Sequence, residues 1–62
     1  MEITVVYPYK LSDGTNFEVF ENIENFQEKY YGVSFIKEKL YYLIPYSNIL
    51  SFLLMEEDNN DT

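Results

Sequence analysis

Alternating apolar positions open the chain. Ile3, Val5 and Tyr7 are spaced two apart, and β-branched residues dominate Glu2–Val6. This spacing predicts a strand over Glu2–Val6. Pro8 follows and has no N–H for a ladder hydrogen bond, so it confines the end of this strand to an edge or a bulge.

A turn and a second strand follow. Asp13-Gly14 supplies the positive φ that a tight turn requires. The chain then returns as a predicted strand over Asn16–Phe20, with Phe17 and Val19 facing inward. We therefore expect a hairpin at the start of the chain.

The spacing changes over Asn22–Tyr31. Ile23, Phe26 and Tyr30 recur three and four positions apart, which favours a short helix. Gly32 stands where a glycine often ends a helix. The alternative is a continued strand, in which Ile23 and Phe26 would point to opposite faces.

Strand-like segments fill the rest of the apolar sequence, at Val33–Lys37, Tyr41–Tyr46 and Ile49–Met55. The turn Lys37-Glu38-Lys39 has no glycine, so we expect a loop longer than two residues there. Ile49–Met55 is apolar on both faces apart from one serine, as in a strand covered on both sides. A short helix from Asn48 is the competing interpretation.

These elements predict an α+β fold, a small antiparallel sheet of three to five strands with one short helix packed on it. The alternative is a five-stranded barrel resembling the SH3 and Sm-like small folds, with Tyr42–Leu54 forming the paired last strands. We expect residues 1–55 to form a single domain. Residues 56–62 are acidic and carry nothing apolar, which is typical of a disordered tail.

Charge narrows the classes of partner. Eleven acidic residues against four basic ones give a net charge of -7. Binding to nucleic acid or to anionic membranes depends on basic side chains, so neither is expected. A strongly acidic surface instead keeps a protein soluble and steers it towards a basic partner.

Catalytic and cofactor chemistry is not indicated. The chain has no cysteine and no histidine, which excludes disulfides and Cys/His zinc sites. No nucleophile context, glycine-rich phosphate loop or metal-ligand spacing occurs, so we expect a non-enzyme without metal or cofactor. No signal peptide and no apolar run long enough to span a membrane is visible, which predicts a cytoplasmic protein.

Size and composition favour association. A 62-residue chain without disulfides must find stability in an unusually apolar core or in a partner, and this chain has seven tyrosines and five phenylalanines. One face of the last apolar segment has no obvious intrachain cover. We therefore predict a homodimer whose interface contains Ile49, Leu50, Phe52, Leu53 and Leu54.

The expected helix carries a candidate binding face. Glu21, Glu24 and Glu28 are spaced three and four apart, so on a helix they would lie about 5–6 Å apart along one side. Phe26 and Tyr30 lie beside them. The first interpretation is an ordinary amphipathic helix with its aromatic side chains in the core. The second is an acidic binding face with aromatic anchors.

One segment resembles a known family. Asp13-Gly14, Phe17-Glu18 and the run Phe26-Gln27-Glu28-Lys29-Tyr30-Tyr31-Gly32 are similar to the dimeric uracil-DNA glycosylase inhibitors of Bacillus phages. The resemblance implies a small phage protein that inhibits a host enzyme by DNA mimicry, with Phe26 filling the pocket that the enzyme uses on DNA. Gln27 departs from the acidic residue that the family places after this aromatic.

Two functions therefore remain from the sequence. The first is a non-enzymatic phage protein that binds and inhibits a host nucleic-acid-handling or defence enzyme, with uracil-DNA glycosylase as the specific target. The alternative is a structural or adaptor module for protein interactions, built on an SH3/Sm-like barrel. The predicted partner-binding residues are Glu21, Glu24, Phe26, Gln27, Glu28 and Tyr30.

Overall fold

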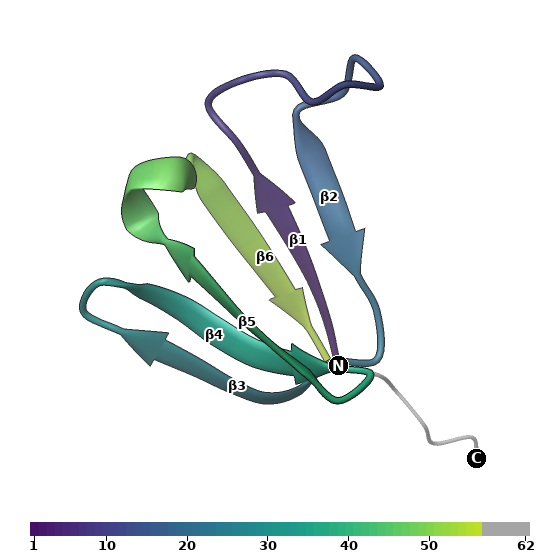
Figure 1. The fold of residues 1–62 in the computed structure, drawn as a ribbon, viewed down its shortest axis with the longest axis vertical. Coiled ribbons are helices and arrows are strands. Elements are labelled where there is room, and N and C mark those ends of the chain that lie inside the picture. Colours follow the sequence, from purple (N-terminus) through teal and green to yellow (C-terminus); the bar gives the residue numbers. More distant parts are fainter. Residues whose placement is uncertain (57–62) are drawn as a thin grey trace.

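The computed structural model describes residues 1–56, which form two antiparallel three-stranded sheets (Figure 1). The first sheet has the order β2-β1-β6 and consists of β1 (Glu2–Val6), β2 (Phe17–Phe20) and β6 (Ser51–Met55). The second has the order β3-β4-β5 and consists of β3 (Glu24–Lys29), β4 (Gly32–Lys37) and β5 (Leu40–Pro45). A single 3-10 turn, η1 (Tyr46–Asn48), carries the chain from β5 to β6.

The predicted α+β class is wrong, because no helix packs on either sheet in residues 1–56. The segment Asn22–Tyr31, which was expected to be a helix, instead contains strand β3. A β-bulge interrupts the pairing of β3 with β4, where Glu24 pairs with Ile36 but Gln27 pairs with Ser34. Asn25 takes a φ of 57° within this bulge.

The bulge explains the misleading spacing. In a regular strand, residues three apart point to opposite faces. One extra residue in the strand shifts this alternation. Ile23 is consequently buried and Phe26 packs against the same core, although the two are three positions apart. A bulged strand thus reproduces the apolar spacing of a helix.

The alternative barrel differs from the structure as well. Its paired last strands, Tyr42–Leu54, are not paired with each other, because β5 pairs with β4 and β6 pairs with β1. The two strands lie in different sheets, and residues 1–56 form six strands rather than five. The competing helix from Asn48 is also absent, since Ser51–Met55 is a strand.

The second strand has the opposite facing from the one predicted, whereas Ile3, Val5 and Tyr7 share the buried side as expected. β1 matches its predicted bounds, but Ile3 pairs with Phe20 and Val6 pairs with Phe17. Paired residues of antiparallel strands share a face, so Phe20 points inward while Phe17 and Val19 point outward. The long connection through the Asp13-Gly14 turn does not fix the register of β1 and β2.

The turn between β4 and β5 is shorter than expected. Lys37 pairs directly with Leu40, leaving only Glu38 and Lys39 as the two turn residues. Their φ angles are 53° and 68°. Positive φ at both positions gives a turn whose twist matches that of the strands, and here it forms without glycine.

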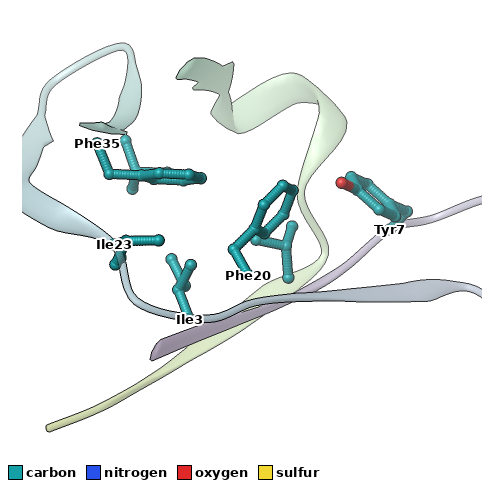
Figure 2. Close-up of a cluster of buried hydrophobic side chains, with 7 residues drawn as sticks. Ile3, Tyr7, Phe20, Ile23 and Phe35 are labelled. Atoms are coloured by element: carbon teal, nitrogen blue, oxygen red, sulfur yellow. The ribbon is translucent and has the colours of Figure 1, made fainter. Parts of the chain in front are cut away.

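The hydrophobic core lies between the two sheets (Figure 2). Its buried members are Ile3, Val5, Tyr7, Phe20, Ile23, Val33 and Phe35. The ring of Phe20 from the first sheet lies 5.1 Å from that of Phe35 in the second, and Tyr42 stacks on Phe35 at 5.2 Å. The Ile23 N–H also donates to the carbonyl oxygen of Met1 at 2.8 Å, which ties the link between the sheets to the start of β1.

No helix within residues 1–56 has the length and apolar character needed to cross a membrane. The predicted acidic tail falls, apart from Glu56, outside the described residues.

Candidate protein-binding surfaces

A shallow groove lies where the β1–β2 connection meets the residue before β6. Its volume is about 250 Å³, and its walls are Tyr7, Pro8, Tyr9, Lys10, Gly14, Asn16 and Leu50. The rings of Tyr7 and Tyr9 stack with centroids 5.3 Å apart and an interplanar angle of 18°. Leu50 leaves 66% of its surface exposed. The groove therefore offers aromatic and aliphatic surface to solvent.

Backbone hydrogen bonds hold both walls on β1. The Tyr7 N–H donates to the carbonyl oxygen of Asn16 at 2.7 Å, which extends the β1–β2 pairing beyond the strands. The Leu50 N–H donates to the carbonyl oxygen of Val6, also at 2.7 Å. The first bond positions the wall that contains Tyr7, and the second positions the wall that contains Leu50. Both walls are therefore held by the central strand β1 and the residue that follows it.

The loop that closes one end of the groove has its own internal bonds. The backbone N–H and the hydroxyl of Thr15 donate to Oδ1 of Asp13 at 3.0 and 2.7 Å. These two donors lower the pKa of the Asp13 carboxyl. The Gly14 N–H donates to the carbonyl oxygen of Leu11, and Gly14 takes a φ of 89°. Asp13 thus shapes the loop, as expected of a turn aspartate.

Tyr7 joins the groove to the core. Its side chain is buried, and its hydroxyl donates to Oε1 of Glu18 at 2.9 Å. The pKa of the Tyr7 phenol is raised, mainly by burial and to a smaller extent by the hydrogen bond to Glu18 and the negative charge of Glu18. Tyr7 therefore stays neutral and serves as a fixed wall of the groove.

The predicted acidic ladder is not formed. Glu21, Glu24 and Glu28 are all exposed, but Glu21 precedes β3 and the other two lie near its opposite ends. Four residues of strand span about 13 Å, against the 5–6 Å expected on a helix. Gln27 is exposed and pairs with Ser34 across the sheet. These side chains lie on the edge strand β3 or just before it, and they do not form a regular array.

The two aromatic residues of the predicted binding face differ in burial: Phe26 is half-buried and Tyr30 is exposed. Phe26 is half-buried, and its ring centroid lies 6.0 Å from that of Phe52 in the other sheet. Phe26 therefore packs against the core instead of standing free. Tyr30 is 94% exposed in the β3–β4 turn, where its ring meets the edge of Tyr31 at 5.2 Å.

The residues predicted for a dimer interface fall into two groups. Ile49, Phe52 and Leu54 are half-buried and pack against the core. Leu50 and Leu53 are exposed, Leu50 in the groove and Leu53 on the opposite side of the first sheet. The alternation of faces along β6 causes this division.

Leu53 belongs to a larger apolar surface that the sequence analysis missed. The strand register places one set of side chains on the side of β2-β1-β6 that faces away from the core. We call this set the outer face, and its members are Glu2, Thr4, Val6, Phe17, Val19, Ser51, Leu53 and Met55. All except Glu2, which lies at the end of the face beside Met55, are uncharged. The available signal was the apolar character of alternate positions in both β2 and β6, since each strand has apolar residues on both sides.

Within residues 1–56, no group of three or more acidic, cysteine or histidine side chains is arranged to hold a metal ion. The groove and the outer face both offer apolar surface suited to binding another polypeptide. No protein-family profile, characterised protein or solved structure was found to match this chain.

Proposed function

We propose that the protein is a protein-interaction module that binds an extended peptide segment of its partner in the groove. The observation that carries this proposal is that the stacked Tyr7–Tyr9 pair and the exposed Leu50 line the same groove. Tyrosine rings give a large contact area at low entropic cost, which suits them to recognition surfaces. At about 250 Å³ the groove is smaller than the roughly 300–1,000 Å³ of small-molecule sites, so it suits one or two peptide side chains.

Charge indicates the kind of segment. The protein has a net charge of -7, so its field attracts a segment with basic residues. Apart from Lys10 and Asn16, the side chains that line the groove are aromatic or aliphatic, so an apolar side chain should occupy it. We therefore expect ligands in which an apolar residue is flanked by lysine or arginine.

A displayed library of random peptides tests this function. Selected peptides should carry the apolar and basic pattern and should bind the purified protein in fluorescence polarisation. Leu50→Ser and Tyr9→Ala should each weaken binding at least tenfold. Leu40→Ser is the matched control, because Leu40 is 60% exposed and lies outside the groove. The proposal fails if no peptide is selected, or if binding is insensitive to both groove variants.

Inhibition of a host enzyme that handles nucleic acid is a second proposal, and the net charge of -7 supports it. The helix expected to mimic DNA is not present in the described residues, and Phe26 is engaged with Phe52. Inhibition would therefore depend on exposed carboxylates such as Glu24 and Glu28 on the β3 edge. Uracil release by a glycosylase, measured with added protein at rising salt, tests it. Salt-sensitive inhibition is expected, and unchanged activity would rule out this target.

A further inference from the structure

We propose that the outer face of β2-β1-β6 binds a second copy of this chain. The proposal is independent of the groove, because the groove lies at the start of β6 while the outer face uses the opposite side of the sheet. On this face Phe17, Val19, Leu53 and Met55 each leave about half of their surface exposed. Four such side chains on one sheet form a contiguous apolar surface of the kind that marks an interaction site.

The strands themselves indicate that both sides of this sheet need cover. In β6, Phe52 and Leu54 pack against the core, whereas Leu53 and Met55 point away from it. Strands with apolar residues on both sides are characteristic of sheets covered on both faces. Among residues 1–56, the core between the sheets has seven buried apolar residues, and small domains without disulfides commonly gain stability by oligomerising. A partner on the outer face would supply both cover and stability.

The charge distribution selects a second copy as that partner. Eleven acidic side chains occur in the sequence, yet Glu2, which pairs with Met55, is the one that the strand register places on the outer face, and it lies at the end of that face. A basic partner would find a single carboxylate at the end of this surface. Two copies, in contrast, can join over the uncharged part of the face without burying a carboxylate at its centre, where desolvation would be costly.

The geometry fits a two-fold pair. A self-complementary contact places the same strands of each copy against each other, and stacked sheets lie about 10 Å apart. A face of three strands, each five residues long or less, spans only about 14 by 17 Å. This is roughly 240 Å² of flat area per copy and roughly 480 Å² for the pair, which is below the lower limit of about 1,000 Å² for specific, stable interfaces. We therefore expect a weak dimer with a Kd between about 10 µM and 1 mM.

Sedimentation velocity of matched variants tests the proposal. Leu53 and Leu40 are 59% and 60% exposed, but only Leu53 lies on the outer face. Between about 1 µM and 1 mM, wild type and Leu40→Lys should pass from monomer to dimer, and Leu53→Lys should weaken the dimer more than tenfold. Circular dichroism establishes that each variant is folded. Val19→Lys, on the neighbouring strand, should have the same effect and decides the matter if Leu53→Lys is unfolded.

Salt gives a second readout. Two copies of charge -7 repel each other, and added salt screens that repulsion, so the dimer should strengthen as salt rises. A wild type that stays monomeric at 1 mM, or a Leu40→Lys variant that loses the dimer as fully as Leu53→Lys, overturns the proposal. Peptide binding by the monomeric variant should persist, so failure of the dimer and failure of the groove are distinguishable.

Discussion

Replacing Gly32 by alanine tests the close approach of β4 to β5. Gly32 pairs with Pro45, and a methyl group added at Gly32 would overlap the carbonyl oxygen of Ile44 and lie 2.8 Å from Cα of Pro45. Cβ atoms essentially never approach other atoms closer than 3.0 Å, and ordinary contacts begin at 3.4 Å, so the backbone of both Ile44 and Pro45 must shift to admit the methyl group. Because both obstacles are backbone atoms, no change of rotamer relieves the overlap.

The magnitude follows from the packing. Overpacking a well-packed site costs about 1–3 kcal/mol, and a ladder hydrogen bond that lengthens as the strands separate adds up to about 1 kcal/mol. We expect Gly32→Ala to lose about 2–3 kcal/mol. A domain of 62 residues has a total stability of only about 3–9 kcal/mol, so this is a large fraction. The Tm should fall by roughly 8–24 °C.

Urea denaturation followed by circular dichroism measures the loss. Gly14→Ala is the comparison, because Gly14 has a φ of 89° but no atom within 4 Å of the added methyl group. Backbone strain alone should cost about 1–2 kcal/mol there. If Gly32→Ala stays within about 0.5 kcal/mol of wild type, or loses no more than Gly14→Ala, the steric argument is wrong.

Four further outcomes are expected, each measured by urea denaturation. Replacing Glu38-Lys39 by Asn-Gly should stabilise the fold by about 1 kcal/mol, because asparagine and glycine tolerate the positive φ of that turn; a loss of stability would contradict its assigned geometry. Asn25→Val should cost about 1–2 kcal/mol more than Asn25→Gly, since valine is strained at a φ of 57°, and equal stabilities would argue against the bulge. Phe35→Ala should lose about 3–5 kcal/mol or unfold the chain, because Phe35 is fully buried, and a smaller loss would place it outside the core. The raised pKa of Tyr7 means that above pH 10 the unfolded chain releases the phenol proton while the folded chain retains it. Stability should therefore fall by up to about 1.4 kcal/mol per pH unit above pH 10, and Tyr7→Phe should lack this part of the decline.

The contrast between β1 and β3 shows what the sequence could predict. Glu2–Val6 alternates regularly and forms the strand that its pattern predicts. In β3, the bulge at Asn25 adds one residue between Ile23 and Phe26, and the resulting spacing of three is shared by a helix. Apolar spacing alone cannot separate these structures. The asparagine at position 25 is a local sequence signal compatible with a bulge, because asparagine tolerates the positive φ that this residue adopts.

Gly32 illustrates a similar limit. A glycine after an apolar segment fits the end of a helix, but here it follows a strand turn and its role is to admit the backbone of Ile44 and Pro45. That requirement comes from a segment more than ten positions away. No local pattern could have indicated it.

The groove could not be predicted for the same reason. Tyr7 and Tyr9 lie far from Leu50 in the sequence, and the pairing of β1 with β6 brings them together. The outer face was partly visible, since the apolar character of β6 on both sides predicted an interface that includes Leu53. Its extension across β2 was missed because Phe17 was assigned to the core.

Both proposals depend on β6 and on Leu50, the residue before it. Side chains along this segment alternate between the two sides of the sheet, so the groove and the dimer contact do not compete. Leu50 and Leu53 are three positions apart, so they face opposite sides of the same sheet. A dimer formed through Leu53 would leave both copies of Leu50 exposed and would present two grooves at a fixed separation. A partner with two suitable segments would then bind by avidity, with the second contact made at high effective concentration. A peptide with a single segment would gain nothing from the dimer. The gain from linking two segments should therefore disappear in Leu53→Lys, whereas binding of the single segment should not change.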